Sequence, residues 1–347
     1  MPTGPETGDD AGTMPATDDL DRGTGEEGAA AGLVRLDDVL AAADRIDGQV
    51  VRTPLLPCPW ADEQHHLWLK PENLQPTGSF KMRGALNAVG ALDAGVRSRG
   101  VLTHSSGNHG RALAWAARVY GVPAVVVMPD TSPAVKIEGV RALGAEIVIV
   151  APAERETRVA VLMAERGLVV VPPYEHRDVI AGQGTIGLEV VAELPDAGTV
   201  LVPVGGGGLV SGVAVAVKAL RPDVRVVGVE PELAGDLAEG FAIGRRVVWD
   251  PALTYRTVAD GVRLPAVGEL NWHHIEALVD DVVTVSEQGI MDAMSRLLRD
   301  SWIVAEPSGA VAVTAYFEHP DSAAGPTVAV VSGGNVDPAL LFRVLTG

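Results

Sequence analysis

Apolar and polar residues alternate along this chain with two periods, and together these periods predict an α/β fold. Short β-branched runs occupy residues 101–103, 124–128 and 147–150, with helical patterns at 111–119 and 134–143 between them. A second set of strands is expected at 199–204, 224–229, 282–285 and 328–331, accompanied by helices at 179–192, 209–220, 288–298 and 308–317. Such alternation is typical of right-handed βαβ units and parallel sheets.

The order of these elements predicts two domains separated by a cleft, each with an open, mostly parallel, twisted sheet flanked by helices. We expect residues 33–91 and 175–347 to form the larger domain and residues 92–174 to form a smaller domain inserted in it. Apolar residues at helical spacing from Leu36 to Ile46 predict the first folded helix, with Gly48 as its C-terminal stop. Residues 67–70 read as a strand.

Residues 1–32 carry eight acidic residues against one arginine and almost no large apolar side chains. Such a segment buries too little surface to offset the entropy of ordering, so we expect a disordered acidic tail. A solubilising extension is favoured over a binding segment.

Lys81 follows a turn at Gly78-Ser79, and Ser79 is the expected N-cap of a helix that continues through Ala85. A partly desolvated lysine near the positive end of a helix has its ammonium form disfavoured, which an amine nucleophile requires. This stretch therefore indicates Schiff-base chemistry. A solvated lysine in a first helical turn is the alternative.

Three further polar or glycine-rich segments each follow an apolar run: residues 105–110, 205–208 and 332–335. The four glycines from Gly205 to Gly208 open a predicted helix, where backbone N–H groups can approach a phosphate. A flexible turn and a dinucleotide-binding loop are alternative interpretations. A Walker loop is disfavoured because no Gly-Lys-Ser/Thr ending follows.

Composition restricts the partners. With 27 Lys and Arg against 45 Asp and Glu, the formal charge is −18, which argues against binding to a nucleic-acid backbone. No apolar run approaches the roughly 20 residues of a membrane helix, and the N-terminus lacks signal-peptide order, so we expect a cytoplasmic protein. The single Cys58 cannot form an internal disulfide.

Taken in order, four motifs resemble the threonine dehydratase and serine racemase branch of the fold type II pyridoxal-phosphate enzymes. They are Ser79-Phe80-Lys81 with Arg83-Gly84, Ser105 to Gly110, Gly205 to Leu209, and Ser332 to Asn335, and the likeness extends from Leu33 onward. The resemblance implies the fold type II architecture, pyridoxal 5'-phosphate in the cleft, a small hydroxy amino acid as substrate and a homodimer.

The resemblance also implies roles for individual residues. Lys81 would hold the cofactor and move the substrate Cα proton, while Phe80 would pack against the ring. Asn108 would bond the ring 3-hydroxyl and Ser332 would face the pyridine nitrogen; a neutral hydroxyl there suits elimination. The phosphate would bind at Gly205, Gly206, Gly207, Gly208 and Leu209. The substrate carboxylate would bind at Ser105, Ser106, Gly107, Asn108 and His109, with Ser106 also the acid/base of the second face. His104 and His109 are otherwise expected to be structural.

Glu230 and Asp236 lie six residues apart in an acidic turn, which is usually solvated but can hold a hard cation. The resemblance implies that Glu230, the Ala234 carbonyl and Asp236 bind a divalent cation, with Mg2+ the first choice. Arg111 and Tyr174 depart from the glutamine and asparagine of the nucleotide-responsive racemase, so activation by ATP is not expected.

These observations predict a pyridoxal-phosphate-dependent ammonia-lyase (dehydratase) that converts L-threonine and L-serine to 2-oxobutanoate and pyruvate plus ammonia. A serine racemase and a hydroxyaspartate dehydratase or racemase are the nearest alternatives. A non-catalytic pyridoxal-phosphate-binding protein and a nicotinamide-dependent dehydrogenase are more remote ones.

Overall fold

The computed structural model describes residues 32–61, 66–105, 107–132 and 134–346. Residues 33–347 form one compact unit. Apart from Gly32, the acidic tail expected over residues 1–32 lies outside the described residues.

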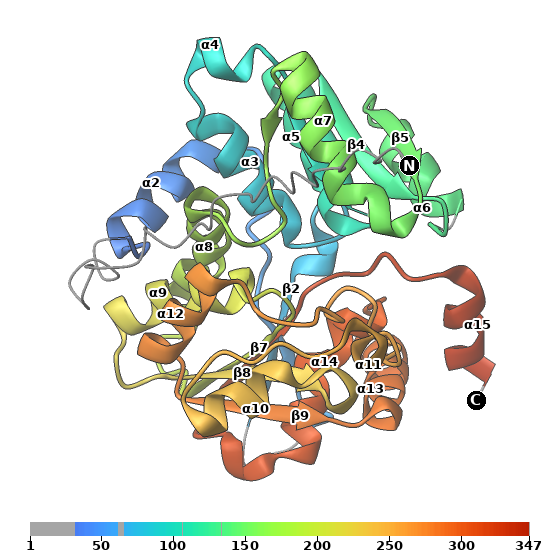
Figure 1. Ribbon diagram of the computed structural model, residues 1–347. Coiled ribbons are helices and arrows are strands. Elements are labelled where there is room, and N and C mark those ends of the chain that lie inside the picture. The colour runs from blue at the N-terminus through green and yellow to red at the C-terminus, as the bar shows by residue number, and fades with distance from the viewer. Residues whose placement is uncertain (1–31, 62–65, 106, 133, 347) are drawn as a thin grey trace, which may run out of the picture. The chain divides into compact units, whose positions relative to one another are not determined.

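Two sheets organise this unit (Figure 1). The first has six strands in the order β1 (Leu56–Cys58), β2 (Leu67–Pro71), β10 (Thr327–Val331), β7 (Thr199–Pro203), β8 (Arg225–Pro231) and β9 (Asp281–Val285). The second has four strands in the order β5 (Glu146–Val150), β4 (Ala124–Pro129), β3 (Val101–His104) and β6 (Val169–Val170). All neighbouring strands are parallel except the antiparallel pair β1 and β2. The predicted α/β class with two mostly parallel sheets is therefore confirmed.

Helices connect and cover these strands. They are α2 (Leu36–Ile46), α3 (Lys81–Ala91), α4 (Ala94–Arg97), α5 (Asn108–Tyr120), α6 (Ala134–Arg141), α7 (Arg155–Arg166), α8 (Arg177–Glu193), α9 (Gly208–Leu220), α10 (Asp236–Ile243), α11 (Pro251–Thr254), α12 (Glu269–Leu278), α13 (Glu287–Ser301), α14 (Pro307–Glu318) and α15 (Pro338–Thr346). Short 3-10 turns are η1 (Glu72–Leu74), η2 (Pro152–Glu154), η3 (Glu232–Ala234) and η4 (Pro320–Ser322). Helix α2 ends where expected, with Gly48 in the left-handed region at φ +69°.

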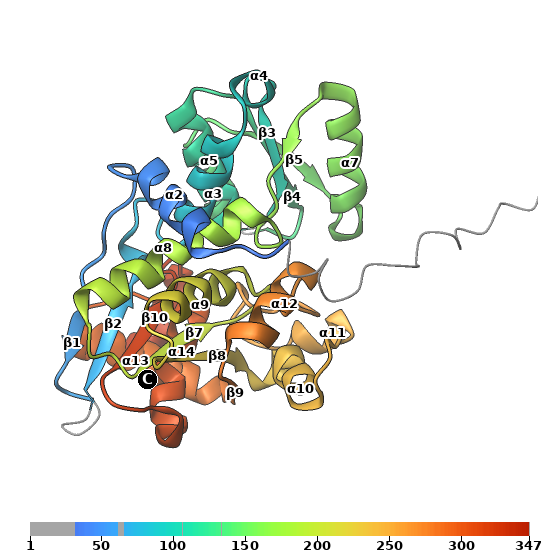
Figure 2. The same ribbon diagram turned by 90° about the vertical axis from the view of Figure 1, so that its left-hand side faces the viewer.

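The central strands β7 and β10 of the six-stranded sheet are buried on both faces, which explains why they are nearly continuous apolar runs. Along β10, Val328 and Val330 join the core formed with α8 and α9, whereas Ala329 and Val331 join the core formed with α13 and α14. Figure 2 shows α8 and α9 side by side along the sheet. Alternate residues of one strand point to opposite faces, so this single run supports two helical layers.

The four-stranded sheet is covered in the same way. Val126 of β4 packs in a core with α3 and α5, and its neighbours Val125 and Val127 pack against Val159 and Leu162 of α7. Helix α3 therefore contributes to the core of the second sheet although the sequence assigned it to the larger domain. The division into residues 33–91 with 175–347 and residues 92–174 stays a prediction.

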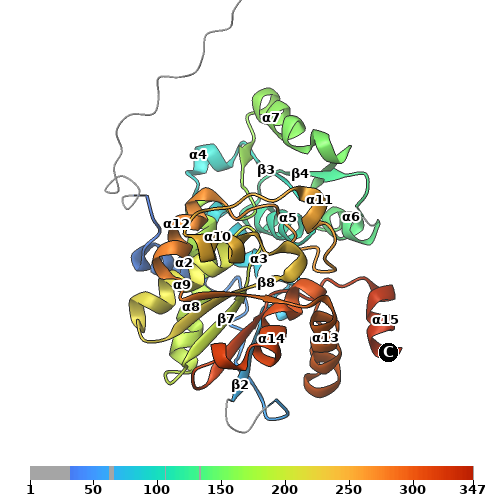
Figure 3. The same ribbon diagram turned by 60° about the horizontal axis from the view of Figure 1, so that its bottom comes forward.

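At the far end of the chain, α15 lies beside α13 (Figure 3). Within the described ranges, no helix has both the length and the apolar character needed to span a bilayer.

Candidate active site

The loop that carries Lys81 is fixed by the segment that follows β10. Ser79 pairs with Gly333 in an isolated antiparallel bridge, and the Phe80 N–H donates to the Ser332 carbonyl over 3.1 Å. Helix α3 begins at Lys81 with Phe80 as its N-cap. The expectation that Ser79 caps this helix is wrong, because Ser79 is held in the extended bridge one residue earlier.

The Lys81 amine is enclosed by protein. Its Nζ donates to the Pro173 carbonyl over 2.7 Å and lies 4.9 Å from the centre of the Phe80 ring. Burial lowers the pKa of Lys81 to about 8. The neutral amine is therefore far more abundant near neutral pH than it is in a solvated lysine, and the solvated-lysine alternative does not fit this geometry.

Four buried or largely buried charges lie behind the Lys81 helix. Arg83 is bidentate to Glu72 through Nε and Nη2, both at 2.8 Å, and it also bonds Glu189 at 2.7 and 2.9 Å. Lys70 Nζ completes the cluster with a 2.6 Å bond to Glu189. Burial alone would raise the pKa of Glu72, but Arg83 and then Lys70 hold it below its ordinary value. Two cations and two anions thus balance one another at the base of α3.

The glycine loop after β7 forms a bare backbone cradle. A Cβ on Gly206 would lie 2.3 Å from the Tyr174 ring, and Gly207 has φ +87°, which only glycine adopts readily. The Gly206 carbonyl accepts from Gly268 N–H and from the Asn271 amide. Within the described part of the chain, the N–H groups of Gly205, Gly206 and Gly207 have no acceptor.

This cradle leads directly into α9, whose first residue is Gly208, and Leu209 anchors the helix start in the core. Unpaired N–H groups at a helix N-terminus form an anion site. Because Pro173 contacts Lys81 and the next residue, Tyr174, covers Gly206, the amine and the anion cradle are neighbours.

The loop expected to hold a substrate carboxylate is partly described. Ser105 Oγ accepts from the Gly107 N–H over 3.2 Å, and α5 begins at Asn108. His109 bonds the Val171 carbonyl through Nε2 at 2.9 Å, and burial, with Lys81 nearby, lowers its pKa to about 3. A neutral, buried His109 fits the expected structural role. Ser106 lies outside the described residues, so its expected place in this loop stays a prediction.

Ser332, which is buried, lies at the end of β10. Its Oγ donates to the Ser308 carbonyl over 3.2 Å, and its own carbonyl is the acceptor for Phe80 N–H. The structure therefore places Ser332 next to Phe80, the residue before Lys81, and the expected role of Ser332 stays a prediction.

Glu306 is a residue that the sequence analysis did not assign. Its Oε1 accepts from Asn108 Nδ2 over 2.5 Å, and burial, followed by the nearby Asp260, raises its pKa to about 7. Both Asn108 and Glu306 line a cavity of about 390 Å3, where Lys136 bonds Asp260 over 2.5 Å. The sequence offered a signal, because Glu306 stands before Pro307 at a helix start and the segment from Glu306 to Ala310 also resembles the family.

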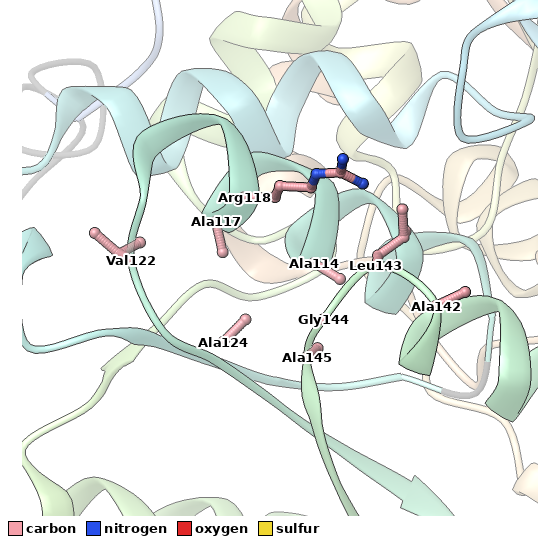
Figure 4. A pocket seen from close by; sticks show the side chains of 9 residues that line it. All are labelled: Ala114, Ala117, Arg118, Val122, Ala124, Ala142, Leu143, Gly144 and Ala145. Carbon is pink, nitrogen blue, oxygen red and sulfur yellow. The ribbon is translucent and has the colours of Figure 1, made fainter.

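A second cavity, of about 410 Å3, lies in the four-stranded part of the unit (Figure 4). Its lining is small and apolar except for Arg118, with Ala114 and Ala117 on α5 facing Ala142, Leu143 and Ala145. It contains none of the residues that the sequence analysis selected for chemistry.

The three expected metal ligands lie at the end of β8 and the start of α10. Glu230 accepts from the N–H groups of Leu237 and Ala238, and Asp236 Oδ2 is buried with no hydrogen-bond partner in the described chain. Burial raises the pKa of Asp236 to about 7, and burial together with Asp236 raises the pKa of Glu230. No group of three or more His, Cys, Asp or Glu side chains suited to a metal occurs in the described residues. The cation therefore stays a prediction.

Known proteins match this chain over most of its length. Residues 46–333 match the family of pyridoxal-phosphate dependent enzymes. The chain is 40% identical over 319 residues to an L-threonine ammonia-lyase of Thermotoga maritima, covering 90% of this chain and 78% of that protein. It is 40% identical over 306 residues to a beta-hydroxyaspartate dehydratase of Paracoccus denitrificans, covering 87% and 96%.

The structure of maize serine racemase superposes with a TM-score of 0.85 at 36% identity, covering 90% of this chain and 97% of that one. Proteins named for three different activities thus match most of this chain. The match over residues 46–333, which contain Lys81, the glycine loop and Ser332, shows that the chain belongs to the pyridoxal-phosphate-dependent enzymes.

Proposed function

We propose that this enzyme is an ammonia-lyase that converts L-serine and L-threonine to 2-oxo acids and ammonia. The observation that carries the proposal is the adjacency of the Lys81 amine, with its pKa lowered to about 8, and the bare glycine cradle at the start of α9. Pro173 contacts the amine and the next residue, Tyr174, contacts the glycine cradle. An amine and an anion site that lie so close together suit a ligand that carries an aldehyde and a phosphate.

The residues present fit pyridoxal phosphate. The unpaired N–H groups of Gly205, Gly206 and Gly207, with the N-terminus of α9, would hold the phosphate. Phe80 would pack against the ring, Asn108 would bond its hydroxyl, and Ser332 would face its nitrogen. When bound, the cofactor supplies an electron sink for a carbanion at the substrate Cα.

The chain's own residues then carry out two tasks. Lys81 would hold the cofactor through its aldehyde, and the Lys81 amine would remove the proton from the substrate Cα. The electrons of the broken Cα–H bond would form the Cα=Cβ bond, and the β-hydroxyl would leave as water by taking up the proton that Lys81 has removed. Hydrolysis of the resulting enamine gives the 2-oxo acid and ammonia. The loop from Ser105 to His109, including Ser106, would hold the substrate carboxylate.

We also propose that Glu230, the Ala234 carbonyl and Asp236 bind a divalent cation, with Mg2+ the first choice. The unpartnered Asp236 Oδ2 and the mutual repulsion of two buried carboxylates support this assignment, since a cation would satisfy both. The predicted homodimer is a further proposal by resemblance.

A second candidate function is racemisation of serine, or elimination from hydroxyaspartate. It is favoured by the similarity to maize serine racemase and to the Paracoccus beta-hydroxyaspartate dehydratase. In that case Ser106 would exchange a proton on the face opposite Lys81.

Proton NMR in deuterated water, with chiral analysis of the remaining amino acid, separates these functions. Purified enzyme with pyridoxal phosphate and Mg2+ is incubated separately with L-serine, L-threonine and 3-hydroxyaspartate. Pyruvate and 2-oxobutanoate with the residual substrate still L support the ammonia-lyase. Deuterated D-serine forming faster than pyruvate supports a racemase, and exclusive turnover of hydroxyaspartate reassigns the substrate. Bound cofactor without turnover of any of the three refutes the proposal, and Lys81→Ala is the control for non-enzymatic reaction.

A further inference from the structure

Four side chains form a continuous hydrogen-bonded row beside the Lys81 loop. Arg111 Nη1 donates to Asn335 Oδ1 over 2.5 Å, Asn335 Nδ2 donates to Asn108 Oδ1 over 2.6 Å, and Asn108 Nδ2 donates to Glu306 Oε1 over 2.5 Å. Arg111 and Asn108 belong to α5, Asn335 follows β10, and Glu306 precedes α14. We call this row the amide relay.

The direction of the amide relay is fixed by its neighbours. A guanidinium only donates hydrogen bonds and a backbone carbonyl only accepts them. Asn335 contacts one of each, since it accepts from Arg111 and donates to the Thr77 carbonyl over 3.0 Å. Its oxygen must therefore face Arg111 and its nitrogen must face Thr77 and Asn108.

This orientation leaves Asn108 one choice. Because Asn335 presents a donor, Asn108 must present its oxygen to Asn335 and its nitrogen to Glu306. An amide nitrogen carries two hydrogens, of which Glu306 takes one. The second N–H of Asn108 has no acceptor among the described residues, and Asn108 lines the cavity together with Glu306.

We propose that Arg111 and Asn335 are positioning residues that hold Asn108 with its amide nitrogen, rather than its oxygen, toward the cofactor ring. This inference rests on the proposed function, in which Asn108 contacts the ring hydroxyl. A donor at that position stabilises the ring oxygen in its anionic form. Without Arg111 or Asn335, only Glu306 would still orient Asn108; a half-turn of the Asn108 amide, with a protonated Glu306 donating to its oxygen, would present an acceptor and favour the protonated ring oxygen.

The backbone of the Lys81 loop is built around Asn335. Gly78 has φ +77°, and a Cβ there would lie 2.5 Å from Asn335 Oδ1. Gly78 also accepts at its carbonyl from the Gly334 N–H over 2.9 Å. Glycine at position 78 therefore provides both the turn before Lys81 and the space that seats Asn335 against Thr77.

The test is the absorbance spectrum of the holoenzyme, which distinguishes protonated from unprotonated ring oxygen by two bands. We expect Arg111→Met and Asn335→Ala each to shift the ratio of these bands about tenfold toward the protonated form, as expected for loss of one hydrogen bond to a charged oxygen. The double variant should shift it no further, because both residues act through Asn108. In an Asn108→Ala background, Arg111→Met should have no effect.

Two variants serve as controls. Arg118 lies on α5 seven residues after Arg111 and is exposed, so Arg118→Met should leave the band ratio unchanged. Arg111→Lys keeps a donor for Asn335 Oδ1 and should restore most of the wild-type ratio. If Arg111→Met fails to fold, as a thermal melt would show, Asn335→Ala and Arg111→Lys decide the question.

The outcomes separate this inference from the proposed function. Wild-type enzyme without any bound-cofactor band would refute the function itself. Normal cofactor binding and turnover, with wild-type band ratios in Arg111→Met and Asn335→Ala, would refute only the positioning role. Additive shifts in the double variant would also refute it, because they would show two independent paths.

Discussion

Removing Arg83 tests whether the buried charge cluster supports the Lys81 helix. Arg83→Met takes away six hydrogen bonds, four of them to Glu72 and Glu189, and leaves the fully buried Glu72 carboxylate without the cation that it pairs with. Breaking a buried ion pair by removing one partner costs about 3–5 kcal/mol. We expect a loss of unfolding free energy of this size at pH 8.

The loss should depend on pH in a definite direction. In the wild type, Arg83 holds the pKa of Glu72 below its ordinary value, so this stabilisation is present above the unfolded pKa and disappears as pH falls through the folded one. In Arg83→Met, burial dominates and raises the pKa of Glu72. The defect of the variant should therefore shrink on acidification, by up to about 1.4 kcal/mol per pH unit.

Urea unfolding of the apo enzyme at pH 8 and pH 6 measures both effects, since urea does not screen charges as guanidinium does. Arg52→Met is the matched control, because Arg52 pairs with Glu193 at 3.2 Å but its side chain is 62% exposed. Exposed pairs contribute about 0–1 kcal/mol. Equal defects in the two variants, or an Arg83→Met defect that is the same at both pH values, would show that the cluster does not stabilise the fold as argued.

Three further outcomes are expected. Gly206→Ala places a methyl group against the Tyr174 ring and should weaken cofactor affinity at least about tenfold, as measured by equilibrium titration. Gly95 has open space around it, so Gly95→Ala should leave the affinity unchanged. Equal affinities of the two variants would show that the glycine loop does not bind the cofactor phosphate. Mg2+ should raise the thermal midpoint of the EDTA-treated wild type but not that of Asp236→Asn. Without Mg2+, Asp236→Asn should be the more stable protein, because the substitution removes the repulsion between the buried carboxylates of Glu230 and Asp236. An equal response of the two proteins to Mg2+ would reject the cation site. Because the folded pKa of Lys81 is lowered to about 8, the rate of cofactor attachment to apo enzyme should rise with pH and level off above about 8; a rise that continues toward 10.5 would contradict the buried amine.

Much of the fold follows from local sequence patterns. The strand expected at 328–331 is observed as Thr327–Val331, because Val328 and Ala329 each need a core on their own side of the sheet. Helix α7 was not assigned, since only Val159 and Leu162 of its twelve residues are buried and its apolar face is correspondingly narrow. Helix α3 begins after Ser79 because Ser79 pairs with Gly333 in a backbone bridge. A contact between residues so far apart in the chain leaves no local sequence pattern.

The site divides in the same way. Lys81, the glycine loop and Ser332 are recognisable because each stands in a short motif after a strand. The pairing of Asn108 with Glu306 joins residues 198 positions apart, and the contact of Tyr174 with Gly206 depends on two separate elements. Such contacts follow from the way the sheets pack, so the sequence alone did not predict them.

The position of β10 has a consequence for synthesis of the protein. The strands of the four-stranded sheet are all translated by Val170, so that sheet can form early on the ribosome. The six-stranded sheet cannot, because β10 is translated last but lies between β2 and β7. Until Thr327–Val331 emerges, β2 and β7 carry open edges, which favour aggregation. A chain terminated shortly before this strand would lack the middle of its sheet and the backbone bridge that holds the Lys81 loop.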